Sequence, residues 1–228
     1  MWIPKALILC LIFVGTGLSW AEDKEVLWVD RFSQAVNPDG LPEGWTLEKE
    51  PGKQSKISLE KEGDNYFVRI LSVEDTFGLE KKISLDIRKY PYFSWRWKVA
   101  KIPPKGDIRK RDTDDEAGQI YVLFPKFPTT INTRSVGYIW DSQARVGLFG
   151  TSTAYSKMKY VILESGSSKL NQWVTETRNV YKDYKKLFQA EPPEAGGVLL
   201  YINTQHTKGS AECFYDDIFF SSKPPEKK

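Results

Sequence analysis

One segment decides the fold class of this chain: FSWRWKV at residues 93–99. Large apolar side chains occupy every second position, and smaller or charged side chains stand between them. Successive side chains of a β-strand point to opposite faces, so a period of two predicts a strand with one face in a core. We expect the phase shared by Trp95 and Trp97 to be the core face. On the polar face, Arg96 is then the candidate ligand residue.

The same period extends along the chain in both directions. Further strands are predicted at residues 26–29, 56–60, 66–71, 79–85, 119–124, 136–140, 159–164, 173–178, 198–203 and 212–220. Turn sequences such as NPDG (37–40) and EGDN (62–65) separate them. Residues 180–190 have a helical pattern, which Pro192 and Pro193 end. About ten short strands with such turns predict an all-β fold, a two-sheet antiparallel β-sandwich with one short helix.

Residues 1–21 have the pattern of a signal peptide. Lys5 supplies a positive charge, residues 6–14 form an apolar run, and Ser19-Trp20-Ala21 places small residues at both positions that determine cleavage. The run is shorter than the roughly 20 apolar residues that a membrane span needs. We therefore expect a mature chain that starts at Glu22, has no membrane span, and is periplasmic or secreted.

Composition excludes several classes of function. The chain has 33 basic and 30 acidic residues, a net charge of +3 that is too small for a nucleic-acid-binding surface. His206 is the only histidine, which excludes a multi-histidine zinc site within one chain. Cys213 is the only cysteine after the signal peptide, and we expect a buried, unreactive thiol. No linker divides residues 22–222, so we expect one domain there, followed by a disordered tail at 223–228.

Several motifs resemble known families. VDRF (29–32), GW (44–45) and YDDIFF (215–220) resemble the first and last strands of galactose-binding-like jelly rolls, the architecture of many carbohydrate-binding modules. The central motifs are similar to an exported bacterial domain-of-unknown-function family, number three thousand and forty-seven; they are FSWRWKV, DDEAGQIYV (114–122), GYIW (137–140) and ETRNVYKDY (176–184). The resemblance implies a jelly-roll sandwich and no particular activity.

The resemblance to jelly-roll modules also implies a cofactor. In such folds the first and last strands are neighbours, and a structural calcium ion can join them. Asp30 and Asp217 are the residues that would hold it here, and we expect no other cofactor. Asp217 satisfying backbone donors at a turn is the alternative.

Binding of a glycan or another cell-envelope polymer, without catalysis, is the function that we expect. Tyr138 and Trp140 lie two residues apart, so they share one strand face on which sugar rings would stack. Arg96, Arg134, Arg178 and His206 would supply hydrogen bonds to the ligand. Alternation does not determine which face is exposed to solvent, so burial of Trp140 in the core is an equal alternative.

An enzyme acting on glycans is the second hypothesis. Asp115 and Glu116 belong to an acidic run just before a predicted strand, and Glu164 lies on another strand. One of the first two, paired with Glu164, would supply the acid and the base of a hydrolase or lyase. A solvated acidic loop is the alternative for this run. An envelope scaffold that offers a sheet face to another protein is the third hypothesis.

Overall fold

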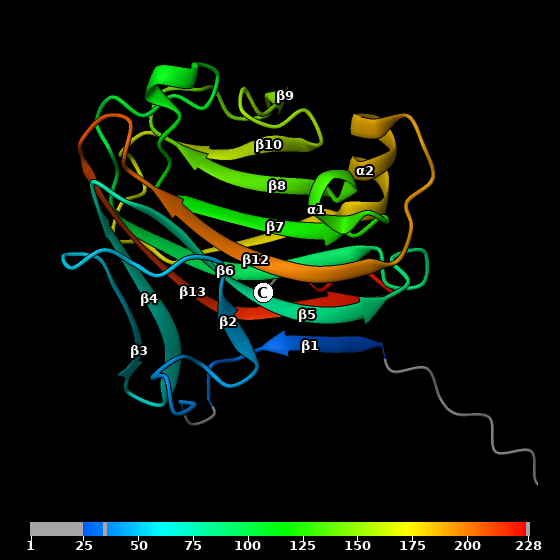
Figure 1. Ribbon diagram of the computed structural model, residues 1–228. Coiled ribbons are helices and arrows are strands. Elements are labelled where there is room, and N and C mark those ends of the chain that lie inside the picture. Colours follow the sequence, from blue (N-terminus) through cyan, green and yellow to red (C-terminus); the bar gives the residue numbers. More distant parts are fainter. Residues whose placement is uncertain (1–24, 34–35, 227–228) are drawn as a thin grey trace, which may run out of the picture.

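A computed structural model describes residues 25–33 and 36–226, so the predicted signal peptide lies outside the described residues. Two β-sheets pack face to face, which confirms the predicted β-sandwich (Figure 1). Most neighbouring strands are antiparallel, as predicted, but β8 (Arg134–Asp141) and β10 (Met158–Ser165) run parallel. Within the described residues, no helix is long and apolar enough to cross a membrane.

The first sheet has six strands. Its order is β11-β6-β13-β4-β3, and β1 lies beside β13. The bounds are β11 (Val174–Asn179), β6 (Tyr92–Lys101), β13 (Ser210–Ser221), β4 (Asn65–Val73), β3 (Lys56–Glu62) and β1 (Val26–Asp30). The pairing of β1 with β13 joins the first strand to the last, as the jelly-roll resemblance implies.

The second sheet has seven strands in the order β2-β5-β12-β7-β8-β10-β9. Besides β8 and β10, they are β2 (Trp45–Leu47), β5 (Thr76–Leu85), β12 (Ala195–Asn203), β7 (Gly118–Phe124) and β9 (Phe149–Thr151). The strands β2 and β9 were not predicted, because three residues are too few to show a period.

Two helices flank the strands. The predicted helix is α2 (Val180–Phe188), which lies at one end of the sandwich, and α1 (Thr129–Asn132) is a single further turn (Figure 1). A 3-10 turn, η1, spans Arg111–Thr113. The helix α2 begins where the Asn179 side chain accepts a hydrogen bond from the Lys182 backbone, and it ends at Gln189 in the left-handed conformation.

The core lies between the two sheets and follows the phase predicted from β6. Trp95 and Trp97 are fully buried, which confirms the predicted core face. Across the interface, the ring centroid of Trp95 lies 5.1 Å from that of Tyr138, and Trp97 lies 5.7 Å from Trp140. Cys213 is also fully buried, which confirms the predicted burial, and this burial raises the pKa of its thiol to about 12.

Candidate functional site

The two aromatic residues of the predicted stacking platform lie in the core. Tyr138 is 0% and Trp140 is 1% exposed, because the face of β8 that carries them packs against β6. The Tyr138 hydroxyl donates to Asp183 over 3.0 Å, and the Trp140 indole donates to the Gly166 carbonyl over 3.1 Å. The prediction of an exposed stacking face on β8 is therefore wrong, and the burial alternative holds.

Two of the predicted ligand-binding arginines fasten α2 to the sheets. The Arg178 guanidinium makes a two-point contact with Asp183, with distances of 3.0 Å from Nε and 2.8 Å from Nη2. Arg134 donates to the Tyr184 hydroxyl over 3.0 Å, and its guanidinium lies 4.9 Å from the Phe188 ring centroid. Their contacts give both arginines a structural role at α2.

The structure brings Asp115 and His206 together. Asp115 is fully buried, and its Oδ2 accepts hydrogen bonds from the backbone and the hydroxyl of Thr207, both over 2.6 Å. Its Oδ1 accepts from the His206 backbone over 3.1 Å and lies 3.2 Å from the imidazole Nδ1. Asp115 therefore holds the loop between β12 and β13 against the loop that precedes β7.

The other two predicted acid–base carboxylates are also enclosed. Glu116 is 1% exposed, and among the described residues neither of its carboxylate oxygens has a hydrogen-bond partner. Burial, reinforced by Asp114, raises the pKa of Glu116 well above its ordinary value. Glu164 is buried as well, and its Oε1 lies 2.5 Å from the Lys169 ammonium. In this structure, Asp115, Glu116 and Glu164 do not offer a solvent-facing acid–base pair.

The two aspartates expected to hold calcium have cationic partners instead. Asp30 accepts hydrogen bonds from the Trp45 indole over 2.7 Å and from the Lys81 ammonium over 2.6 Å. Asp217 lies between two guanidinium groups, those of Arg31 and Arg96. Within the part of the chain that the structure describes, no three His, Cys, Asp or Glu side chains converge as a metal site would require. In this structure Asp30 and Asp217 therefore form ion pairs in place of the predicted calcium site.

The ion pairs of Asp217 belong to a surface that faces away from the opposite sheet. We define the aromatic–cation strip as five residues on the outer face of the six-stranded sheet: Trp28, Arg31, Arg96, Lys98 and Trp173. Trp28 is 46% exposed, and the Arg31 guanidinium lies 4.2 Å from its ring centroid. Similarly, the Arg96 guanidinium lies 4.9 Å from the Trp173 ring centroid. Each of the two indoles of the strip thus carries one arginine.

Asp217 connects the two stacked pairs. Its Oδ1 lies 3.6 Å from Arg31 Nε, and its Oδ2 lies 3.4 Å from Arg96 Nη1. A β-bulge places the carboxylate there. Asp216 pairs with Arg96 and Phe219 pairs with Ser94, so a step of three residues on β13 faces a step of two residues on β6. The backbone of Asp217 is left-handed, with φ of 47°. The bulge therefore brings one carboxylate into reach of an arginine on β6 and an arginine just after β1.

Sequence reasoning found Arg96 and missed the other members of the strip. Lys98 stands on the same polar face of β6, a signal that was visible in the alternation. Trp28 shares β1 with buried Val29, and Trp173 comes just before β11. No pattern in the sequence shows that these two indoles meet arginines from other segments.

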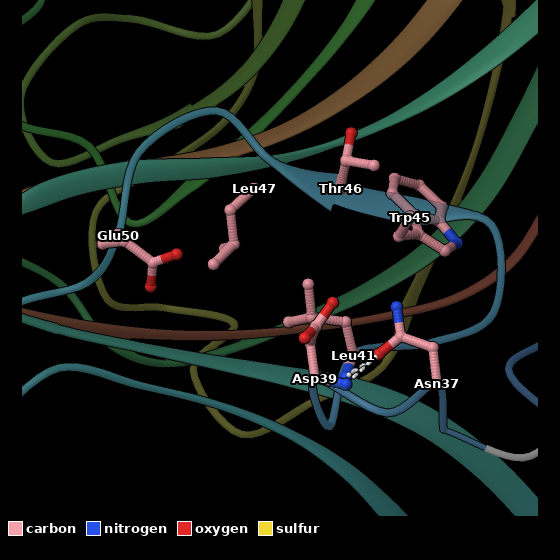
Figure 2. A pocket seen from close by; sticks show the side chains of 7 residues that line it. All are labelled: Asn37, Asp39, Leu41, Trp45, Thr46, Leu47 and Glu50. Atoms are coloured by element: carbon pink, nitrogen blue, oxygen red, sulfur yellow. Dashed lines mark hydrogen bonds between the residues drawn. The ribbon is translucent and has the colours of Figure 1, made fainter.

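A separate pocket of about 450 Å³ lies between the loop at 37–41 and β2 (Figure 2). Its lining residues are Asn37, Asp39, Leu41, Trp45, Thr46, Leu47 and Glu50. Trp45 is 1% exposed, so its ring does not form an open platform for a sugar. The pocket contains none of the predicted site residues.

Comparison with known protein families identifies the chain's family. Residues 43–219 match the family model described as "Protein of unknown function (DUF3047)". The chain belongs to the DUF3047 family. This confirms the resemblance of the central motifs. A search of curated proteins gives no match to this DUF3047 protein.

Solved structures include proteins with a similar arrangement of strands. One is the family 11 carbohydrate-binding module of the cellulosomal cellulase Lic26A-Cel5E of Clostridium thermocellum, with 10% identity, 89% of this chain and 98% of that chain covered, and a TM-score of 0.46. Another is a variant family 29 carbohydrate-binding module complexed with cellulohexaose, with 9% identity, 87% and 92% coverage, and a TM-score of 0.38. The agarase AgWH50C has 10% identity, 90% and 25% coverage, and a TM-score of 0.40. At these identities the likeness concerns the fold alone.

Proposed function

We propose that this DUF3047 protein is an exported, non-catalytic module that binds a polysaccharide or a similar cell-envelope polymer. The binding surface is the aromatic–cation strip on the outer face of the six-stranded sheet. The observation that carries this proposal is the pair of stacked Arg–Trp units connected by Asp217. A sheet face suits an extended polymer, because neighbouring strands present side chains at regular intervals along it.

The geometry of the strip favours binding of a polar polymer. Stacking on the indoles and pairing with Asp217 restrict Arg31 and Arg96 before any ligand arrives, so less conformational entropy is lost on binding. A guanidinium that rests on an indole face keeps in-plane N–H groups for ligand oxygens. The Trp28 and Trp173 rings thus orient cations. This role differs from the sugar stacking that was predicted for the aromatic residues of β8.

Measurement of binding by affinity gel electrophoresis tests the proposal. The gels contain a panel of soluble plant and bacterial envelope polysaccharides, and the expected result is retarded migration in at least one of them. Arg96→Ala and Trp173→Ala should each abolish most of the retardation. Arg88→Ala is the matched control, because Arg88 is exposed on a loop and pairs with Asp86.

Two outcomes contradict the proposal. One is normal migration of the wild type in every gel, which favours the envelope-scaffold hypothesis. The other is retardation that the Arg96 and Trp173 variants retain in full while they stay folded by circular dichroism. Release of reducing sugar or of an unsaturated product from a retained polymer would contradict the non-catalytic assignment.

Export is tested separately. We expect the protein recovered from the periplasm or the medium to begin at Glu22, because Ser19-Trp20-Ala21 has the pattern of a cleavage site. N-terminal sequencing measures this directly. Recovery of an intact chain that begins at Met1 from the cytoplasm would contradict it.

A further inference from the structure

Within residues 25–33 and 36–226, Lys98 is a cation without an acidic partner. Its ammonium lies 4.5 Å from the Phe214 ring centroid, 5.0 Å from Trp173 and 5.5 Å from Phe67. Among the ion pairs of the described residues, none includes Lys98, although its side chain is half-buried. Three aromatic rings attract the ammonium but do not neutralise its charge. The charge of Lys98 is therefore available to an anion from outside the chain.

The rest of the strip is also short of negative charge. Arg31 and Arg96 share Asp217 as their solvent-accessible carboxylate, whose side chain is 28% exposed. The second nearby carboxylate, Asp216, is buried; its Oδ2 lies 3.6 Å from Arg96 Nη1 but has no hydrogen-bond partner within the described part of the chain. Burial, together with Asp217, raises the pKa of Asp216, although the Arg96 guanidinium opposes the shift. The three cations of the strip thus exceed its exposed negative charge.

We infer that the ligand of the strip is an acidic polysaccharide, a chain of uronic acids whose carboxylates contact Arg96 and Lys98. This inference rests on the proposed function and names the chemical class of its ligand. The two cations lie two residues apart on β6, so they project from one face about 7 Å apart. The planar fork of a guanidinium matches a carboxylate with two hydrogen bonds. A carboxylate at one cation and a second along the chain at the other would supply the missing negative charge.

A neutral glycan fits the strip less well. Its hydroxyl groups would cover the Lys98 ammonium without neutralising it, and removal of water from an uncompensated charge is costly. A carboxylate would replace that lost hydration by direct attraction. The same electrostatic attraction predicts that binding weakens as salt screens the exposed part of the strip.

Isothermal titration calorimetry on the folded protein tests the inference with four polysaccharide probes and, as a fifth probe, a DNA oligonucleotide. The polysaccharides are polygalacturonate, the same polymer with its carboxyl groups reduced to alcohols, a neutral β-glucan and dextran sulfate. We expect polygalacturonate to bind at least about tenfold more tightly than the reduced polymer, as for the loss of a charge-assisted contact. Raising the salt to about 0.5 M should weaken polygalacturonate binding, because the screening length falls to a few ångströms.

Variants assign the effect to the strip. Lys98→Met keeps an apolar side chain over the three rings, so the variant should fold, and it should bind polygalacturonate about fivefold or more weakly. Arg96→Gln should weaken binding in the same way. Lys82→Met is the matched control, since Lys82 is exposed on β5 of the other sheet, and it should bind like the wild type.

The outcomes separate this inference from the proposed function. Equal binding of polygalacturonate and its reduced form, or unchanged binding by Lys98→Met, overturns the acidic ligand but leaves glycan binding in place. Equal binding of dextran sulfate overturns the assignment to carboxylate groups. Equal binding of a DNA oligonucleotide would show attraction to any polyanion and overturn a sugar ligand. Binding of no glycan at all overturns both proposals.

Discussion

Tryptophan side chains in this protein have opposite roles, which depend on the strand face from which each side chain projects. Trp140 points from β8 into the core and donates a hydrogen bond to Gly166. Trp28 points from β1 to the surface, where its ring lies 4.8 Å from Phe219 and carries the Arg31 guanidinium. The same residue type therefore fills a core in one place and orients a cation in the other.

Replacing Trp140 with Ala should lower the free energy of unfolding by about 3 to 5 kcal/mol, because it leaves a large cavity in the core. It also leaves the Gly166 carbonyl without its indole donor. Urea denaturation followed by circular dichroism measures the change. Trp28→Ala is the control and should cost less than about 1 kcal/mol, as for an exposed side chain. Equal losses in the two variants would contradict the buried role of Trp140.

At the scale of elements, α2 depends on one buried carboxylate. Asp183 accepts two hydrogen bonds from Arg178 on β11 and one from the Tyr138 hydroxyl on β8. Because β11 and β8 belong to different sheets, this single side chain ties the helix to both layers. The length of α2 is only nine residues, too few to be stable without such tertiary contacts.

Asp183→Ala should destabilise the protein by about 3 kcal/mol, because it leaves the partly buried Arg178 cation and the Tyr138 hydroxyl without their acceptor. In the Asp183→Ala variant, backbone amide hydrogens should exchange faster in α2 than in β7. Lys182→Ala, on the exposed side of the same helix, is the control and should change stability by less than about 0.5 kcal/mol. Unchanged exchange in α2 of Asp183→Ala would show that other contacts hold the helix.

At the scale of the whole molecule, stability depends on pH through Glu176. Its burial, together with the neighbouring Glu164, raises the pKa of Glu176 to about 7 from an ordinary 4.5, although Lys169 and Arg178 oppose the shift. The folded state therefore binds a proton more tightly than the unfolded state. Stability from this group is highest below the unfolded pKa and falls as the pH rises from about 4.5 to about 7.

Glu176→Gln should remove this loss of stability at rising pH. Between pH 4.5 and pH 8, the free energy of unfolding of the wild type should fall by up to about 3 kcal/mol more than that of the variant. Urea denaturation at the two pH values measures the difference. Glu62→Gln, at an exposed end of β3, is the control and should follow the wild type. The same pH dependence in Glu176→Gln as in the wild type would contradict the shift.

Alternation along the chain was enough to predict all strands except β2 and β9, the sandwich, and the core face of β6. The physical reason is local: a strand turns its side chains by half a turn per residue, so a run such as FSWRWKV separates its own faces. Trp95 and Trp97 are buried for this reason. The polar phase likewise placed Arg96 on the outer face, without reference to any other strand.

Contacts between distant segments decided the site. Alternation along β8 left open which face Trp140 meets, and the packing of β6 decides it, because β6 covers the face of Trp140. The opposite face of β8, with Ile139, is buried as well. The pairing of Arg31 with Arg96 through Asp217 joins β6 to β13 and to the segment after β1. Such a meeting depends on strand order and on one bulge, which hydrogen bonds between strands set and which no spacing along the chain encodes.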